Sequence, residues 1–445
     1  MRVIWLPVKR WDGTENRGGC FAFKQQDSAI QSQTLRAKAR ISGRAAFLTA
    51  NVLALSIVSL LADFSTEMIQ PILPLFLVGV LGASYGLVGL IFGSADSVVS
   101  IVKVFSGWYS DRLGRRKPLT VAGYAPTAFL KPLLYFVQSP LQVFAIWLSD
   151  RFGKGVRGAP RDALIASSVE KRDLGKAFGF HRALDTTGAV MGSFLGFVFV
   201  MTIAGSVSQV YRTIFVISSI PAMVSVVVGQ AFVRETSGHK GSTSSEQKPK
   251  LFGGLSSFGP RLRFFLLVSS VFAFSNFNLA FFILRASNEG ISSTVILLLY
   301  TLLNVAYAGV SYPFGVVADK LGRQNVVMMG YVAFIITAIG FAVMPGSLVN
   351  FSLLFVLYGI FMGISDGSQK SYVSEIADPA FRGTALGTVA TLTGLITLPS
   401  SVLAGALWDS YGPSVTFEFG AGAAIVALAL FAVSEATMGR RPGWG

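Results

Sequence analysis

The sequence contains few of the residues that build catalytic and metal sites. Its 445 residues include one cysteine, Cys20, and two histidines, His181 and His239. A single cysteine cannot form an intrachain disulfide, and it excludes a thiolate metal cluster within the chain. Charged residues make up 13% of the chain, compared with about 25% in ordinary globular proteins. These shortages exclude a disordered protein, a coiled coil and an ordinary cytosolic enzyme.

Apolar residues are abundant instead: they account for 52% of the chain, and the mean hydropathy is +0.60. A helix needs about 20 mostly apolar residues to cross the hydrocarbon core, because lipid offers no partner to free backbone groups. The sequence therefore predicts an all-α integral membrane protein with twelve transmembrane helices, the first bent at Pro71 and Pro74. The apolar windows are 46–79, 85–107, 119–137, 141–168, 176–200, 210–232, 262–284, 292–314, 326–345, 350–372, 384–406 and 415–434.

The distribution of lysine and arginine predicts the orientation. If the N-terminus is cytoplasmic, 27 of the 37 basic residues lie in loops and tails on that side, whereas Arg212 and Arg285 lie in the opposite loops. Cytoplasmic loops of membrane proteins carry such an excess. We therefore expect a multi-pass protein of the plasma (inner) membrane with both termini in the cytoplasm. The net charge of +15 then reflects topology, and we expect no nucleic-acid partner.

A polar linker and an internal repeat divide the chain into two halves. Residues 233–260 are rich in Ser, Gly and Lys and show no apolar period, so they predict a flexible cytoplasmic linker. "GWYSDRLGRR" begins at Gly107 and "GVVADKLGRQ" at Gly315, and the same offset of 208 residues relates Gly175 to Gly383. Many transporters build two halves around a midplane site by such duplication. We expect two pseudo-symmetric six-helix bundles, residues 45–232 and 261–435, with cytoplasmic tails at 1–44 and 436–445.

The repeated segment carries a family resemblance. Its first copy has a G-x-x-x-D-R-x-G-R-R pattern made by Gly107, Asp111, Arg112, Gly114, Arg115 and Arg116, and its degenerate second copy has Gly315, Asp319, Gly322 and Arg323. At these positions, between spans 2 and 3 and between spans 8 and 9, the pattern resembles the signature loop of the major facilitator superfamily. The resemblance covers about residues 46 to 435. It implies two bundles that rock around a midplane cavity, without a prosthetic group.

The residue types of this loop suggest a gating role. Asp111 and the neighbouring arginines can pair with one another, with helix ends and with anionic headgroups. Such contacts can exist in one packing of the halves and not in the other, so we expect a latch. The alternative is an anchor that fixes topology alone.

Two further elements resemble the family more loosely. Arg151, Gly155 and Ala159 resemble an R-x-x-x-G-x-x-x-A element that the family associates with proton coupling. Glycines at 188, 192 and 196 resemble the ladder of the family's antiporters, although Ser193 and Phe197 depart from that pattern. The resemblance favours export. The alternative is that glycines spaced by four residues let two helices pack closely.

Charged residues inside the spans are concentrated in the first half. Each costs roughly 3 kcal/mol on insertion scales and needs a partner or a wet cavity. Six of them on span 4 cover an arc of about 140°, which we expect to face the central cavity opposite Asp63 and Glu67. A protonatable carboxyl group that moves between a poorly hydrated site and a neighbouring arginine can bind and release a proton; the alternative is a permanent salt-bridge network. The predicted proton-coupling and cavity residues are Asp63, Glu67, Asp96, Asp150, Arg151, Lys154, Arg157, Arg161, Asp162 and Asp185.

Polar residues of the second half are candidates for substrate binding. They are Asn276, Asn278, Tyr300, Asn304, Tyr307, Asp366 and Lys370. The surplus of basic residues on span 4 could receive an anionic group, or the carboxylates of spans 1 and 2 could already neutralise it. Phenylalanines of span 7 could pack an apolar group, or they could face the core or lipid. An amphipathic small solute is compatible with both features.

Taken with the resemblance, these features predict a secondary active transporter that exports a small solute by proton-coupled alternating access. The alternative is a proton symporter or a facilitative uniporter that takes up an organic anion. We expect a monomer whose partners are the solute, protons and the lipid bilayer, with no cofactor, no metal and no enzymatic activity. The absence of a G-x-x-x-x-G-K-[ST] loop argues against ATP-driven transport.

Overall fold

The computed structural model describes residues 47–236, 258–379 and 381–438, and within these ranges the regular structure is helical, with no strand. The predicted tail 1–44, most of the predicted linker and the last seven residues lie outside the described residues.

In the described residues 47–236, the first half contains seven α-helices and two short 3-10 helices. Apolar windows become helices because only a helix satisfies all backbone groups of a segment in lipid. Serine or threonine caps the start of several helices, as Ser84 does by accepting a hydrogen bond from the backbone N of Leu87. The elements are α2 (Ala50–Ile69), α3 (Ile72–Gly79), α4 (Tyr85–Leu113), α5 (Lys117–Phe129), η1 (Lys131–Tyr135), α6 (Pro140–Ser167), η2 (Lys171–Asp173), α7 (Leu174–Thr202) and α8 (Val207–Phe232).

The second half repeats this plan. Like the first half, it begins with a span that is broken into two helices. Its elements are α9 (Pro260–Ser275), α10 (Ala280–Asn288), α11 (Ser293–Leu321), α12 (Arg323–Val343), α13 (Leu348–Ile376), α14 (Arg382–Tyr411) and α15 (Pro413–Met438).

A helical segment stands at each of the twelve predicted windows. Ten of these segments among the described residues are long and apolar enough to cross a membrane. The other two are α5, which is 13 residues long and continues after a break into η1, and α6, which carries six charged residues near its middle. Composition thus supports ten spans, and the count of twelve rests on the places of α5 and α6 in the bundle.

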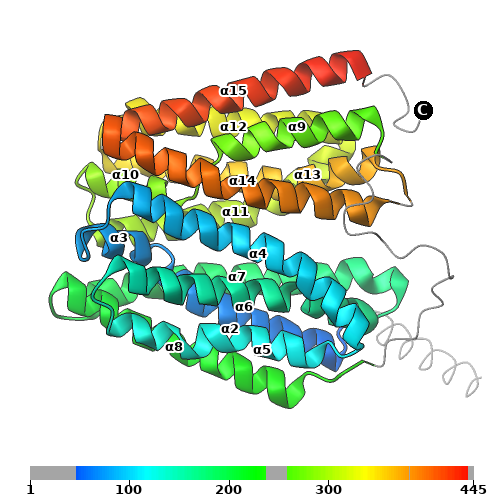
Figure 1. The fold of residues 1–445 in the computed structure, drawn as a ribbon, viewed down its shortest axis with the longest axis horizontal. Coiled ribbons are helices and arrows are strands. Elements are labelled where there is room, and N and C mark those ends of the chain that lie inside the picture. The colour runs from blue at the N-terminus through cyan, green and yellow to red at the C-terminus, as the bar shows by residue number, and fades with distance from the viewer. Residues whose placement is uncertain (1–46, 237–257, 380, 439–445) are drawn as a thin grey trace, which may run out of the picture. The chain divides into compact units, whose positions relative to one another are not determined.

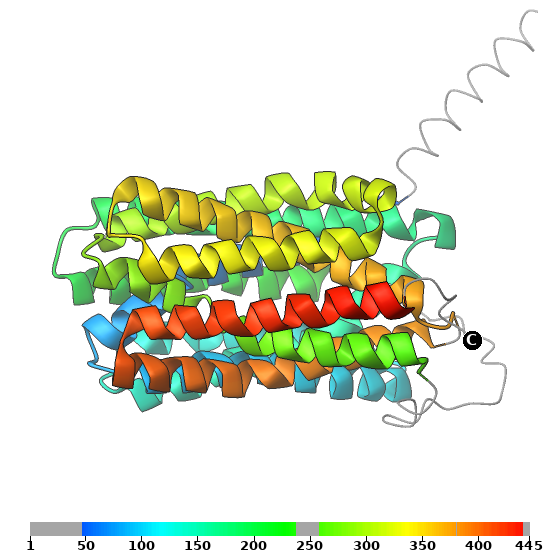
Figure 2. The same cartoon turned by 90° about the horizontal axis from the view of Figure 1, so that it is seen from above.

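The two bundles meet mainly along two helix pairs, α4 with α14 and α7 with α11 (Figures 1 and 2). In Figure 1, α9–α15 form the upper group and α2–α8 the lower one. The helices α4 and α11 are the second spans of their halves, and α7 and α14 are the fifth spans. Each of the two contacts therefore joins the second span of one half to the fifth span of the other. The interface is therefore pseudo-symmetric, as the internal repeat predicted.

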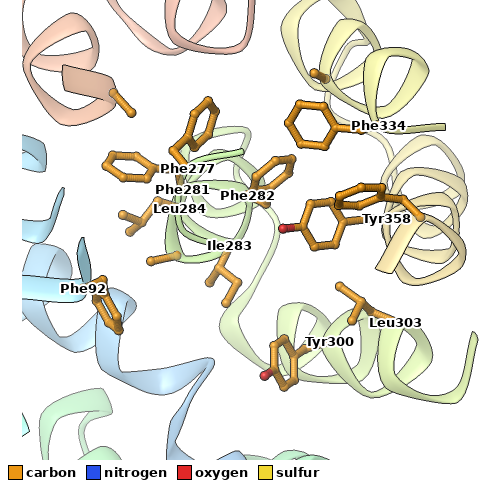
Figure 3. Packing of buried hydrophobic residues seen from close by; sticks show 14 of the residues in the cluster. Phe92, Phe277, Phe281, Phe282, Ile283, Leu284, Tyr300, Leu303, Phe334 and Tyr358 are labelled. Carbon is orange, nitrogen blue, oxygen red and sulfur yellow. The ribbon is translucent and has the colours of Figure 1, made fainter. Parts of the chain in front are cut away.

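Aromatic side chains fill the core of the second half (Figure 3). The ring of Phe272 stacks on Tyr331 with centroids 3.8 Å apart, and the ring centroids of Phe282 and Tyr358 are 4.5 Å apart. Phe277 and Phe281 are buried in the same cluster. Most phenylalanines of the seventh span thus belong to the core, one of the alternatives left open by the sequence.

Two spans are broken for different reasons. The first span breaks between Ile69 and Ile72, and Pro71 forms the N-cap of α3, close to the predicted bend. The seventh span, predicted as one window, breaks between Ser275 and Ala280 without a proline. There Asn278 accepts a hydrogen bond from the backbone N of Ala280 (2.9 Å) and donates its own backbone N–H to Ser401 Oγ (3.2 Å). At this break, the hydrogen bond to Ser401 of α14 and the side-chain bond of Asn278 replace the backbone hydrogen bonds of a continuous helix.

The predicted signature loop is mostly helical, which corrects its description as a loop. Gly107, Asp111 and Arg112 lie in α4, which continues six residues past the apolar window to Leu113. Gly114 then ends the helix in the left-handed conformation with φ 64°. The apolar window marks the part of a helix that lies in the hydrocarbon core, where apolar side chains are required. Polar residues can extend the same helix beyond this core into water. Gly315 and Asp319 lie in α11 for the same reason.

Candidate functional site

A cavity of about 980 Å³ lies between the two halves. Its lining comes from α4 and α6 of the first half and from α9, α13 and α14 of the second; along α4 it runs from Asp96 to Gly107, a rise of about 16 Å. Side-chain exposure falls from 67% at Lys370 and 52% at Lys103 to 7% at Arg151. The cavity therefore deepens from the end of the molecule that contains residues 114–116 and 322, called here the open end, toward the middle of α6.

At the opposite end, called the closed end and marked by residues 80–84 and 412, α4 and α14 are in backbone contact. A Cβ atom placed on Gly89 would lie 2.0 Å from the carbonyl oxygen of Ser401, and one on Gly405 would lie 2.3 Å from that of Tyr85. Real side chains do not tolerate such distances. Glycine at these positions thus allows the two halves to seal this end.

A carboxylate completes the seal. Asp409, near the end of α14, accepts hydrogen bonds from the backbone N of Tyr85 (3.0 Å) and of Gly86 (2.7 Å) at the start of α4. A helix N-terminus carries a partial positive charge that favours such an anion. Beside it, the rings of Tyr85 and Trp408 stack with centroids 4.7 Å apart.

Two predicted carboxylates contact the second half on the closed-end side of the molecule, where Asp96 marks the deep end of the cavity along α4. Glu67 Oε2 accepts a hydrogen bond from Tyr300 Oη (2.5 Å), and Asp96 Oδ2 accepts one from Asn278 Nδ2 (2.7 Å). The sequence predicted that Glu67 faces the basic residues of span 4. Arg151 and Lys154 of that span interact with its carboxyl group electrostatically. Its hydrogen bond, however, crosses to α11, and Tyr300 and Asn278 serve as partners of Glu67 and Asp96.

The charges of α6 begin with a buried pair. Asp150 is 2% exposed, and its Oδ2 lies 3.8 Å from Arg151 Nε. Arg151 Nη2 donates to Gln70 Oε1 (2.8 Å), and its guanidinium lies 4.0 Å from the ring centroid of Trp147. These contacts hold Arg151 at the bottom of the cavity.

The remaining charges of α6 point in several directions. Lys154 lines the cavity with Arg151. Arg157 instead donates to the carbonyl of Gly123 (3.0 Å) and lies over the ring of Tyr124 on α5, and Arg161 donates to Ser59 Oγ on α2 (3.0 Å). The prediction that all six charges face the cavity is therefore wrong, because an arc of about 140° spans more than one neighbouring helix.

The other predicted carboxylates form a network with α2 and α7. Asp162 pairs with Arg161 (3.0 Å) and Lys103 (3.7 Å). Ser59 Oγ donates to Asp185 Oδ1 (2.6 Å), and the carboxyl group of Asp63 lies next to that of Asp185. The sequence marked these residues as charges within spans, although it could not assign their partners.

This network reaches the second half through Arg182. Its Nη2 lies 2.9 Å from Asp366 Oδ2 on α13 and also donates to Tyr307 Oη, while its Nη1 lies 3.6 Å from Asp185 Oδ2. Lys370 Nζ lies 2.6 Å from the same Asp366. Three substrate candidates thus belong to an ion-pair network between the halves. Sequence reasoning did not place Arg182 in the site, because its partner is 184 residues away.

Asp366 also lines a second cavity, of about 880 Å³, between α7 and the helices α11 and α13. Among the candidates, Asn276 lines the central cavity, and its Oδ1 lies 3.5 Å from Tyr358 Oη. Asn304 donates to the backbone carbonyl of Tyr300 (3.2 Å), which is a contact within α11.

The signature residues make their contacts within each half. Arg116 Nη2 pairs with Asp111 (3.1 Å), and the backbone N atoms of Arg116 and Lys117 donate to Glu235, beyond α8. In the second copy, Arg323 lies 3.4 Å from Glu375 and 3.9 Å from Asp319. The observed contacts thus tie the ends of α4 and α8, and of α12 and α13.

The glycine ladder of α7 packs against α2. Cβ atoms on Gly188, Gly192 and Gly196 would lie 2.4, 2.2 and 2.8 Å from the carbonyl oxygens of Leu60, Phe64 and Met68, respectively. Close helix packing therefore accounts for the ladder, and the ladder alone gives no direction of transport.

Lys131 is a buried cation that sequence reasoning did not place in the site. It is 1% exposed in η1, and its Nζ donates to Ser65 Oγ (2.9 Å) and Thr66 Oγ1 (3.0 Å), next to the break between α2 and α3. The sequence did contain a signal for this site, because a lysine within a predicted span needs a polar partner or a wet cavity.

Comparison with known proteins places this architecture in a family. The model of the Major Facilitator Superfamily matches residues 55–287 and 263–444. An uncharacterised MFS-type transporter of Methanocaldococcus jannaschii is 38% identical over 387 residues, which cover 85% of this chain and 93% of that protein. The multidrug resistance protein MdtH of Aeromonas hydrophila is 22% identical over 333 residues, or 75% of this chain and 81% of that protein.

The fold is also similar to a solved structure. A variant of the nucleoside transporter NupG superposes with a TM-score of 0.75 at 15% identity, covering 86% of this chain and 99% of that one. The helical halves, their repeated signature and these matches lead to one conclusion: the chain is a multi-pass membrane transporter that belongs to the major facilitator superfamily.

Proposed function

We propose that the chain is a secondary active transporter that exports a small solute by alternating access, driven by the proton gradient, without chemical conversion of the solute. The observation that carries this proposal is the cavity between the halves, which deepens from the open end and stops at the backbone contacts of α4 and α14. A solute in this cavity has access to one side alone. Rocking of the halves would exchange the two ends.

Proton coupling is supported by where the carboxyl groups lie. Glu67 and Asp96 accept hydrogen bonds from Tyr300 and Asn278 of the other half. An ionised carboxylate accepts such bonds with both oxygens, whereas a protonated one must also donate. Protonation therefore changes the contacts that hold the halves together. Asp63 beside Asp185 is a further carboxyl pair at which a proton can be shared.

The test is a substrate screen in proteoliposomes with an imposed pH gradient. We expect proton-driven movement of a solute opposite to the proton, and its loss in Arg151→Ala, since Arg151 lies at the bottom of the cavity. If Asp63→Asn and Glu67→Gln both leave the dependence on the gradient unaltered, proton coupling through these residues is refuted.

The same assay decides between export and uptake. Export is supported by the similarity to a multidrug resistance protein. A proton symporter would instead acidify the lumen as the solute enters, and a facilitative uniporter would equilibrate the solute without any effect of the gradient.

The membrane topology is part of the proposal. We place both termini and residues 233–260 in the cytoplasm and the protein, as a monomer of two bundles (45–232 and 261–435), in the plasma (inner) membrane. The support is the excess of basic residues on one side. Fusions of alkaline phosphatase or green fluorescent protein after residue 236 should be inactive and fluorescent, respectively; the opposite pattern would invert the topology.

A further inference from the structure

The wall of the central cavity is basic on the side of the first half. The charged residues that line it are Lys103, Arg151, Lys154, Lys370, Asp96 and Asp366. Four cations against two carboxylates leave a formal surplus of two positive charges. Three of the cations, Lys103, Arg151 and Lys154, come from α4 and α6.

Most of these charges already have partners. Lys103 lies 3.7 Å from Asp162, and Lys370 lies 2.6 Å from Asp366. Arg151 donates to Gln70 and lies 3.8 Å from Asp150. Their charges are thus partly or fully compensated within the protein.

Lys154 is different. It is half-buried and lines the cavity, and its ammonium group makes no hydrogen bond and no ion pair within 4.0 Å in the part of the chain that the structure describes. Four carboxylates, Asp63, Glu67, Asp96 and Asp185, interact with this ammonium group electrostatically without a direct contact. Each has another partner: Asp63 lies next to Asp185, and Glu67, Asp96 and Asp185 accept hydrogen bonds from Tyr300, Asn278 and Ser59. The countercharges of Lys154 thus lie beyond direct contact, and its three N–H donors remain available to an anion that enters the cavity.

Arg151 and Lys154 lie on the same side of α6. They are three residues apart on α6, so their side chains leave the same face of the helix, and both line the cavity. An anionic group placed between them meets a guanidinium, which binds planar oxyanions, and an ammonium.

The opposite wall is apolar along part of its surface, next to polar side chains that include Asn276, Gln369 and Thr393. On the side of the second half, the lining includes Phe272 and Ala273 of α9, Phe361 of α13, and Leu386 and Val389 of α14. An apolar group that leaves water for this wall gains free energy in proportion to the area buried. The first-half wall of the cavity thus carries three cations, whereas the second-half wall offers an apolar surface for the body of a solute beside its own polar and charged residues.

We infer that the central cavity selects amphipathic organic anions, with a carboxylate or sulfonate between Arg151 and Lys154 and an apolar body against α9, α13 and α14. This inference rests on the proposed function, because it assigns the substrate class of the same cavity. It also identifies Lys154 as the residue that distinguishes anions from neutral and cationic compounds of the same shape.

Three compounds with one apolar body test the inference: 2-naphthalenesulfonate, 2-naphthalenemethanol and 2-naphthylmethylammonium. Binding to the full chain in phosphatidylcholine nanodiscs is measured by calorimetry. We expect the sulfonate to bind at least tenfold more tightly than the alcohol and the ammonium compound. Lys154→Gln should abolish this preference while leaving the affinity for the alcohol unchanged, and Lys154→Arg should keep the preference.

Lys176→Gln is the matched control, since Lys176 is an exposed cation of α7 paired with Asp173 (2.7 Å) and is absent from the cavity lining. It should leave the affinity for the sulfonate within twofold. Tighter binding of the ammonium compound, a sulfonate preference that survives Lys154→Gln, or binding of none of the three would each overturn the inference.

Transport of the same compounds separates the inference from the proposed function. If the pH gradient drives the ammonium compound and not the sulfonate, the chain is a transporter with the opposite charge selectivity, and the inference alone fails. If the sulfonate binds selectively through Lys154 but no compound is moved by the gradient, the anion site stands and proton-driven transport of this class fails.

Discussion

Asp409 offers the sharpest test of how the closed end is held. The Asp409→Ala variant removes a carboxylate of α14 that accepts two backbone hydrogen bonds at the start of α4. Asp409 is exposed, so its contribution is set by the interaction of a surface anion with a helix N-terminus, about 1 kcal/mol. Because the bonds join the two halves, this energy stabilises the closed end relative to the opened one. A loss of about 1 kcal/mol shifts that equilibrium by about fivefold.

The equilibrium can be measured as a distance distribution. Spin labels at Ala204→Cys and Val349→Cys, in a Cys20→Ser background, report on exposed positions of the two halves near the closed end. We expect Asp409→Ala to increase the population with the longer separation about fivefold, and Asp409→Asn to give a smaller increase because an amide oxygen still accepts one bond.

The matched control is Glu170→Ala. Glu170 is an exposed acid that pairs with Arg172 (2.9 Å) in the same half, so its removal should leave the distribution unchanged. An Asp409→Ala protein that is correctly folded and shows the unaltered distribution would refute the reasoning, since the bonds to α4 would then contribute nothing to closure.

Three further perturbations follow from the contacts. Tyr300→Phe removes the hydrogen-bond donor to Glu67 and should change the transport rate by up to tenfold, and substrate affinity by less, as measured in proteoliposomes. If Tyr300→Phe has the same effect in the wild-type background and in the Glu67→Gln background, a direct bond between the two residues is contradicted. Gly192→Ala places a Cβ where a backbone carbonyl lies 2.2 Å away and should destabilise the protein by about 2 kcal/mol or more, measured as loss of folded protein on heating, whereas Gly175→Ala, with open space around it, should not. Asp111→Ala removes the exposed ion pair with Arg116, which contributes less than about 1 kcal/mol to stability. If the signature segment acts as a latch, the variant should show slower turnover at unchanged stability. Normal turnover would indicate that the segment is a topology anchor alone.

The fold was largely predictable because the membrane imposes one rule on every span. Apolar windows located the helices, and the repeat at Gly107 and Gly315 located the two halves. Helix ends were less predictable, since α4 and α11 extend beyond their windows into polar sequence. The break after Ser275 could not be predicted, because the bonds that replace the helical ones come from Ser401 on α14.

The candidate site was predictable by residue type and not by partner. Carboxylates and basic residues within spans stood out, because each is costly in lipid. Their partners depend on which helix faces which: Glu67 contacts Tyr300, and Arg182 contacts Asp366, pairs separated by 233 and 184 residues. Periodicity places residues on one face of a helix but says nothing of the helix opposite.

The glycines of α7 restrict which motions the first half can make. Three backbone carbonyls of α2 fit above Gly188, Gly192 and Gly196 at successive turns. If α2 slid along α7 by less than a full turn, these oxygens would collide with side chains that bear a Cβ. If the halves rock as proposed, we therefore expect the two helices to travel as one rigid unit, with Ser59 in register with Asp185. Relative movement of the halves would then fall mainly on the contacts of α4 with α14 and of α7 with α11.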